Sequence, residues 1–388
     1  MRSNMLIQIE NGRITGIFPS DELVDWRGRT IDMQGAYVVP GLWEVHAHIG
    51  DLIPDPQNLL ETEHVADYVI RAGRNVFDGL RKGIVGIRLV GEDAYVGVSW
   101  REAFQKGVFL GPTIFSCCKG ISATGGHGHG TLGALEVDGP FEMRKAVRAN
   151  LAHGADQIKL MVTGGVMTPG ETMDECQLLE DEIKAAVHLA HQKGKKVCVH
   201  SWGTEGVKLA IRCGVDSIEH GLLDEESVEL MVKNNTYYVP TLHITQDENN
   251  GAGTDLPRFM RDKIESVKLR HLEGFRLAVD AGVRIACGSD ATPISEFTHL
   301  EMQHLVRGGM SNYQALVAAT RTSASLCDAL VYSGTLELGK DADIVATLHN
   351  PLEDISHLQQ AHFVMRTGNL VPIEKPEGVS NFRDIFMR

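Results

Sequence analysis

Several features are scarce or missing in this 388-residue sequence, and each absence argues against a class of protein. No apolar run reaches the ~20 residues that a membrane-spanning helix needs, and the first ten residues lack the apolar segment of a signal peptide. The seven cysteines are an odd number without a C-x-x-C spacing, which we interpret as reduced thiols in a cytoplasmic protein. Positive charge is also in deficit. The net charge of −14 argues against nucleic acid or a membrane as a partner.

The two ends of the chain have β character, whereas the long middle part does not. Alternating apolar residues flank Asn11-Gly12, a pair typical of a β-hairpin turn, and strand-like runs return after about residue 333. We expect the two ends, 1–40 and 333–388, to form one small β-sandwich domain. Residues 41–332 are then long enough for one barrel-type domain.

In this middle part, apolar runs typical of strands alternate with amphipathic stretches typical of helices. The predicted strands cover 42–48, 84–90, 113–118, 157–162, 196–200, 217–220, 237–243 and 284–289. The predicted helices cover 63–82, 100–107, 141–153, 180–194, 203–213, 224–234, 258–281 and 298–308. Eight strand–helix repeats predict an α/β fold, the (β/α)8 TIM barrel, whose chemistry lies at the C-terminal ends of the strands.

Residues able to bind metal stand at several of these strand ends. His46 and His48 are two residues apart, so in a strand their side chains project from the same face. Histidine or aspartate ends three further runs, at positions His200, His220 and Asp290. One such residue alone is commonly structural, but their joint occurrence favours a metal centre.

Lys159, in the fourth run, needs its own argument, since an ammonium group cannot ligate a metal. A lysine that has added carbon dioxide becomes a carbamate, whose two oxygens bridge two cations. This predicts a centre of two divalent ions, most simply zinc, with the carboxylated Lys159 between them. His46, His48 and Asp290 would bind one ion, and the other two histidines the second. A water between the ions would become the nucleophile, and Asp290 would pass its proton to the leaving group.

The chain resembles the amidohydrolase superfamily, and the resemblance extends over nearly its whole length. The motifs that carry it are Val39-Pro-Gly-Leu-Trp-Glu-Val-His-Ala-His48, Ile158-Lys-Leu-Met-Val-Thr-Gly-Gly165, Val199-His-Ser-Trp202, Ser217-Ile-Glu-His-Gly221, Gly288-Ser-Asp290 and Gly339-Lys-Asp-Ala-Asp-Ile-Val345. The loop Thr124-Gly-Gly-His-Gly-His129 is similar to the branch that contains Xaa-Pro dipeptidases and related carboxypeptidases. Lys159 argues against the neighbouring imidazolonepropionase branch, which normally has one metal.

Three positions depart from the family pattern. Glu44 stands where relatives usually have aspartate, and Leu89 follows Arg88 where they have Arg-Asp. Trp202 replaces a tyrosine or histidine, and its indole offers one donor and no charge to a substrate carboxylate. A bulky, apolar or aryl amide would suit this tryptophan better than a dipeptide does.

Further residues are candidates for the substrate site. By resemblance, His127 would hydrogen-bond the scissile carbonyl, and we also place His129, Trp202 and His243 near the substrate. For Arg88 we favour a buried ion pair over a place near the pocket.

The sequence as a whole predicts a metal-dependent hydrolase of C–N amide bonds, acting on a dipeptide or an N-acyl amino acid. A cyclic or aryl amide, carbamate or urea at the same site is the first alternative. A mononuclear deaminase and a non-catalytic metal-binding barrel are the others. We expect a small-molecule substrate and a homo-oligomer.

Overall fold

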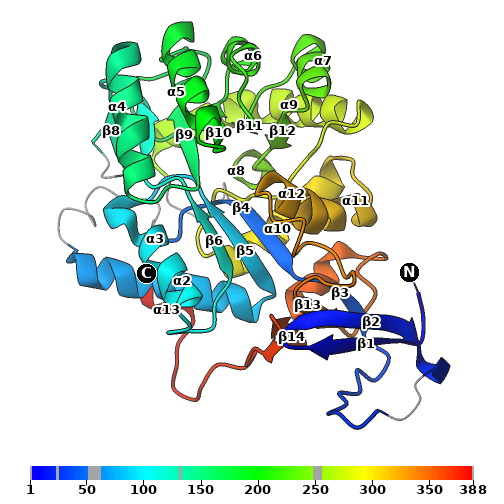
Figure 1. Cartoon of the computed structure of the whole chain (residues 1–388). Coiled ribbons are helices and arrows are strands. Elements are labelled where there is room, and N and C mark those ends of the chain that lie inside the picture. The colour runs from blue at the N-terminus through cyan, green and yellow to red at the C-terminus, as the bar shows by residue number, and fades with distance from the viewer. Residues whose placement is uncertain (1, 23–25, 51–62, 131–132, 248–255, 387–388) are drawn as a thin grey trace.

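The computed structural model describes residues 2–22, 26–50, 63–130, 133–247 and 256–386 (Figure 1). Over this part of the chain the predicted alternation of strands and helices is confirmed up to residue 281. The predicted strand over 284–289 is not formed: this segment is extended, but its ladder is a single bridge between Ile285 and Tyr238. The barrel strands and the short β8 are β4 (Leu42–Ala47), β5 (Ile84–Leu89), β6 (Thr113–Ser116), β7 (Gly120–Ser122), β8 (Ala134–Glu136), β9 (Gln157–Met161), β10 (Lys196–Ser201), β11 (Ser217–His220) and β12 (Tyr237–Val239).

Helices follow the strands and surround them (Figure 1). They are α2 (Val65–Arg81), α3 (Val96–Gln105), α4 (Gly139–Ala152), α5 (Glu180–Gln192), α6 (Thr204–Arg212), α7 (Glu225–Asn234), α8 (Leu242–Gln246), α9 (Arg258–Asp280), α10 (Ile294–Gly308), α11 (Asn312–Val317), α12 (Ser323–Leu326) and α13 (Phe382–Phe386). Among the helices described, none combines the length and the apolar character needed to cross a membrane.

The strands follow the order of a TIM barrel, although the backbone ladders divide them into two sheets. One parallel sheet holds β4, β5 and β6, and the other contains β9, β10, β11 and β12. Segment 284–290 lies between the two sheets. On one side the backbone N–H of Ala286 donates to the backbone carbonyl of Tyr238 in β12 at 2.9 Å, and on the other the backbone N–H of Val45 in β4 donates to the backbone carbonyl of Cys287 at 3.0 Å. On the opposite side, a backbone hydrogen bond of 2.7 Å joins the start of β9 to the end of β6.

Apolar strands account for this arrangement, because each is covered on both faces. All six residues of β4 and of β5 are buried. In β9, Ile158 and Leu160 pack into the largest apolar cluster of the protein. Alternation along the strand then places Lys159 on the opposite face, which is the inside of the barrel.

The two ends of the chain combine in a small β unit, at the lower right of Figure 1. Hairpin strands β1 (Met5–Glu10) and β2 (Arg13–Pro19) are joined at Asn11-Gly12, where both φ angles are positive, as a tight hairpin turn requires. A second sheet pairs β3 (Tyr37–Pro40) with β13 (Ile344–Thr347), and β14 (Phe363–Arg366) and β15 (Asn369–Leu370) continue it. The domain boundaries at 40 and 333 stay a prediction.

The predicted strand over 237–243 is too long. β12 ends at Val239, and Thr241 has a φ of +50°, so α8 begins where the prediction continued the strand. The cause lies far away in the sequence. Glu301 of α10 accepts hydrogen bonds from the backbone N–H groups of Leu242 and His243, at 2.9 and 2.7 Å, and thereby caps the first turn of α8.

Candidate active site

His46 and His48 project together from the end of β4, as the i, i+2 spacing predicts. The Nδ1 atom of His46 lies 2.9 Å from the carboxylate of Glu219, and that of His48 lies 2.8 Å from the carbonyl of Gly91. Both partners are acceptors, so each Nδ1 carries the hydrogen. The Nε2 atoms are left with a lone pair, which is the tautomer that a metal ligand needs.

Asp290 faces these two nitrogen atoms. Its Oδ1 atom lies 3.4 Å from Nε2 of His46 and 3.2 Å from Nε2 of His48. Its backbone N–H donates to the backbone carbonyl of His46 at 2.9 Å, and its φ of +54° lies in the left-handed region. Burial opposes ionisation of Asp290, but the two histidines outweigh it and hold the pKa of Asp290 far below its usual value.

His220 reaches the same place through an unusual backbone conformation. Strand register pairs Glu219 with His200, so these two share the inner face, and strict alternation would turn His220 outward. A φ of +70° at His220 breaks this alternation. Its ring centroid then lies 4.9 Å from that of His46 and 4.6 Å from that of His200. Burial is the main reason that the pKa values of His200 and His220 lie well below normal.

Lys159 lies on the inner face of β9, with only 1% of its surface exposed. Its positive charge helps to lower the pKa values of His46, His200 and His220, which places it within electrostatic reach of all three. Among the described residues, the Lys159 ammonium has no hydrogen bond or ion pair. Its charge interacts at longer range with the carboxylates of Asp290 and Glu219, whose pKa values it helps to lower. A buried ammonium group that makes no direct ion pair is unusual for a lysine that is only structural.

An ion pair that the sequence only partly predicted supports this cluster from behind. Arg88 donates from one nitrogen to both oxygens of Glu219, at 2.8 and 2.7 Å, so the predicted buried ion pair is confirmed. Sequence reasoning missed Glu219 itself. The strand pattern could have indicated it. Glu219 follows Ser217 by two residues, so alternation along the strand puts both side chains on the inner face of the barrel.

His127 approaches the cluster from the loop after β7. Its ring stacks on His200, with centroids 4.0 Å apart and planes inclined by 17°. Glu171, a second residue that sequence reasoning missed, accepts a hydrogen bond from Nδ1 of His127 at 2.8 Å. The side chain of Gln177 accepts from the His127 backbone N–H at 2.8 Å, so ring and backbone are both held.

Of the other three predicted substrate residues, Trp202 contacts the cluster, whereas His129 and His243 contact side chains outside it. His129 is 58% exposed and pairs with Glu136 at 2.7 Å. Trp202 is almost completely buried, and its ring stacks on His220 at 4.8 Å. His243 is buried in α8, where its ring contacts side chains of α10.

The donor atoms fit a divalent metal ion. One ligand atom from each of His46, His220 and Asp290 lies within 4.8 Å of the other two. Imidazole and carboxylate together suit zinc and similar divalent ions. His200 lies beside this group, with its ring centroid 4.6 Å from that of His220 and its Nε2 atom 3.3 Å from the Gly164 carbonyl.

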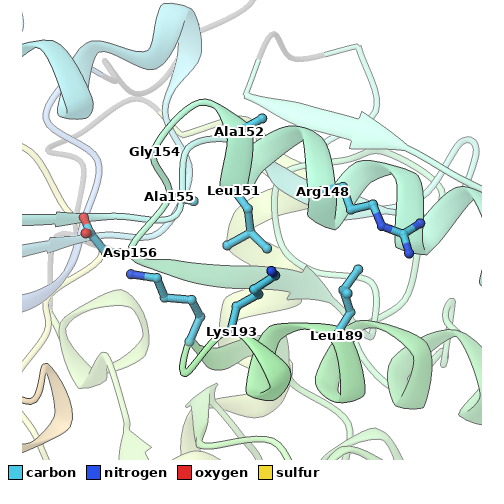
Figure 2. A pocket seen from close by; sticks show the side chains of 9 residues that line it. Arg148, Leu151, Ala152, Gly154, Ala155, Asp156, Leu189 and Lys193 are labelled. Atoms are coloured by element: carbon cyan, nitrogen blue, oxygen red, sulfur yellow. The ribbon is translucent and has the colours of Figure 1, made fainter.

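A cavity of about 660 Å³ lies elsewhere, between α4 and α5 (Figure 2). Its lining includes Gly154, Ala155 and Asp156, which lead into the first residue of β9, so it opens at the N-terminal end of the strand. Catalytic groups of TIM barrels lie at the opposite end. The cavity therefore does not belong to the histidine cluster.

Comparison with known proteins agrees with this geometry. The sequence matches the amidohydrolase family over residues 37–371. Ochratoxinase from Aspergillus niger is 31% identical over 382 residues, which cover 88% of this chain and 78% of that protein.

Solved structures extend the likeness to the whole fold. The crystal structure of a Xaa-Pro dipeptidase with bound methionine in the active site has a TM-score of 0.85 at 34% identity, covering 94% of each chain. A prolidase complexed with N-methylphosphonate-L-proline has a TM-score of 0.84 at 30% identity, covering 94% of this chain and 93% of that one.

Proposed function

Because this chain belongs to the amidohydrolase family and is a hydrolase acting on C–N amide bonds, we propose that it works through a binuclear metal centre. The proposed ligands are His46, His48, Lys159 as its N6-carboxylate, His200, His220 and Asp290. The proposed ions are zinc. When bound, they would lower the pKa of a water and polarise the substrate carbonyl.

One observation carries this proposal: the Nε2 atoms of His46 and His48 both face one oxygen of Asp290, while protein acceptors hold both Nδ1 atoms. A second observation supports the lysine bridge. Lys159 is buried and makes no direct ion pair, and converting its ammonium group into an anion that binds cations would remove the cost of burying that positive charge.

The chain's own residues have separate tasks in this proposal. Asp290 is ionised at neutral pH, so its carboxylate can accept a proton from the attacking water and return it to the leaving nitrogen. His127, oriented by Glu171, would hydrogen-bond the scissile carbonyl oxygen. Trp202 would stack behind His220 and fix the orientation of that ring.

For the substrate we propose a dipeptide or an N-acyl amino acid, from which the C-terminal residue is released. The similarity to a Xaa-Pro dipeptidase and to a prolidase supports this class. An aryl amide is the second candidate, and the similarity to ochratoxinase supports it. The burial of Trp202 weakens the case against dipeptides, because a side chain that is 1% exposed leaves the substrate little to contact.

Metal content tests the bridge directly. Protein prepared with zinc and bicarbonate would be compared with a Lys159→Ala variant, and Lys184→Ala, an exposed lysine on α5, would serve as the matched control. We expect Lys159→Ala to lose at least one ion per chain and nearly all activity, and Lys184→Ala to lose neither. Equal metal content in all three proteins would refute the lysine bridge and favour a mononuclear ring hydrolase or deaminase.

Product analysis then separates the substrate classes. Free amino acids from dipeptides would support the first, hydrolysis of aryl amides alone would support the second, and ammonia from a ring substrate would indicate a deaminase. Absence of all three products from fully metal-loaded protein would contradict the enzyme proposal and favour a metal-binding barrel.

A further inference from the structure

A second group of metal-binding side chains lies outside the barrel centre, where α8 packs against α10. We propose that His243, Asp247 and His304 form a separate site for a divalent transition-metal ion. One ligand atom from each of the three lies within 4.8 Å of the other two. None of them belongs to the proposed binuclear centre, so this site does not depend on the proposed reaction.

The backbone brings these three residues together. His243 lies in the first turn of α8, and Asp247 is the residue directly after its last one, so the short helix brings their ligand atoms within 4.8 Å of each other. Glu301 fixes this helix to α10 by accepting from the Leu242 and His243 N–H groups. His304 follows Glu301 by three residues on α10 and therefore faces the same side.

Burial and ligand chemistry favour a metal ion here. His243 and His304 are buried, with their ring centroids 5.5 Å apart, and the ring of Phe297 lies 4.6 Å from that of His243. Asp247 is half-buried and supplies the anionic ligand. Two imidazoles and one carboxylate are a ligand set of zinc and of its neighbours cobalt and nickel, and they leave one position for water.

Protonation of His304 does not compete with such an ion near neutral pH. Burial, His243 and Arg307 together lower the pKa of His304 to about 4, so its imidazole is neutral and available to a metal. Arg307 also repels a cation, and Asp247 offsets this charge.

Zinc stoichiometry tests this site without an activity assay. Metal-free full-length protein would be reloaded with zinc, freed of loosely bound ions and analysed for zinc per chain. We expect His304→Gln and Asp247→Asn each to hold one ion fewer than the wild type. His299→Gln makes the same substitution at another buried histidine of α10 and is expected to leave the count unchanged.

The zinc count would then be repeated with each substitution added to Lys159→Ala, which separates this proposal from the binuclear one. His304→Gln and Asp247→Asn should still each remove one ion per chain, however many ions the barrel centre holds. The half-buried Asp247 makes Asp247→Asn the safer variant if His304→Gln fails to fold. Equal zinc content in wild type and both variants would overturn the proposal. Loss of all zinc from a folded variant would also overturn it, because the residues would then be supporting the barrel centre.

Discussion

Two glutamates lie on opposite sides of His46, both completely buried, and their carboxylates have opposite pKa shifts. On the side of β5 and β11, the pKa of Glu219 is lowered to about 2. On the side of β4 and α10, the pKa of Glu44 is raised to about 7. Burial favours the neutral form of both groups, so the difference must come from their partners.

The partners differ in charge. Burial raises the pKa of Glu219, but the Arg88 guanidinium and the hydrogen bond from His46 outweigh it. Among the described residues, the donors to Glu44 are neutral: the backbone N–H groups of His46 and Ser289 and the hydroxyl of Thr298. The comparison teaches that a buried carboxylate stays ionised in this protein where a cation touches it, and gains a proton where only dipoles do.

The distances between oxygen atoms around Thr298 agree with a protonated Glu44. The Thr298 oxygen lies 2.8 Å from Glu44 Oε2 and also 2.8 Å from the Ile294 carbonyl oxygen, although the hydroxyl has one hydrogen to donate. If that hydrogen goes to Ile294, a proton on Glu44 completes the other bond. The Glu219 side therefore fixes the tautomer of His46 with a permanent anion, while the Glu44 side holds the backbone with an acid.

The largest effect is expected from Glu219→Gln, which breaks the charged side. Arg88 would become a buried cation without its anion, which costs about 3–5 kcal/mol of unfolding free energy. His46 would lose its anionic acceptor, and zinc affinity should fall roughly 10–100-fold. Urea unfolding of the metal-free protein and a zinc competition titration measure the two effects. The exposed Glu205→Gln is the matched control, and a Glu219→Gln variant as stable as that control would contradict the charge argument.

Removing both charges should be milder than removing one. In Arg88→Met with Glu219→Gln no unpaired cation remains, so we expect the double variant to regain about 2 kcal/mol relative to Glu219→Gln. The same urea experiment measures this difference. A double variant less stable than the single one would show that Arg88 acts mainly through its bonds to Val45 and Ser217.

Glu301 offers a second test of the contrast between Glu219 and Glu44. Like Glu44, it is a buried carboxylate whose donors are backbone N–H groups and not a cation. Burial raises its pKa from 4.5 to about 8. Its contribution to stability is therefore complete below pH 4.5 and is lost as the pH rises through 8. Glutamine resembles the protonated acid, so Glu301→Gln should cost about 1 kcal/mol at pH 5, for one lost hydrogen bond. At pH 9 the wild type has lost its contribution, so the variant should be more stable than the wild type by a few kcal/mol. Urea unfolding at both pH values checks this, and a cost that is equal at both or larger at pH 9 would mean that Glu301 is ionised.

The surroundings of Glu219 and Glu44 also show which parts of the site the sequence predicts and which it leaves open. The alternation of apolar runs predicts the barrel, and the strand ends predict His46, His48, His200, His220 and Asp290 as neighbours, because parallel strands bring their C-terminal ends together. Partners from distant parts of the chain were not predictable. Glu219 is 131 residues from Arg88, and only the closed fold brings them into contact.

Local backbone conformation is a second feature that the sequence does not predict. A strand pattern cannot show the positive φ that turns His220 inward, nor that Glu301 caps a helix where His243 was expected to end a strand. The loop Thr124–His129 illustrates the same limit, since its two histidines look equivalent in sequence. Only His127 is drawn inward, because Glu171 and Gln177 hold it.

The smallest effect is expected from Glu44→Gln, the same substitution as Glu219→Gln at equal burial. Glutamine reproduces a protonated Glu44: its oxygen can accept from His46 and Ser289, and its amide can donate to Thr298, whose hydrogen then goes to Ile294. At pH 6, below the pKa of about 7, the cost should stay within about 1 kcal/mol. Zinc affinity, measured by the same competition titration, should change less than in Glu219→Gln. A cost near that of Glu219→Gln would mean that Glu44 is ionised in the folded protein, and that neutral donors alone can hold a buried charge beside the metal ligands.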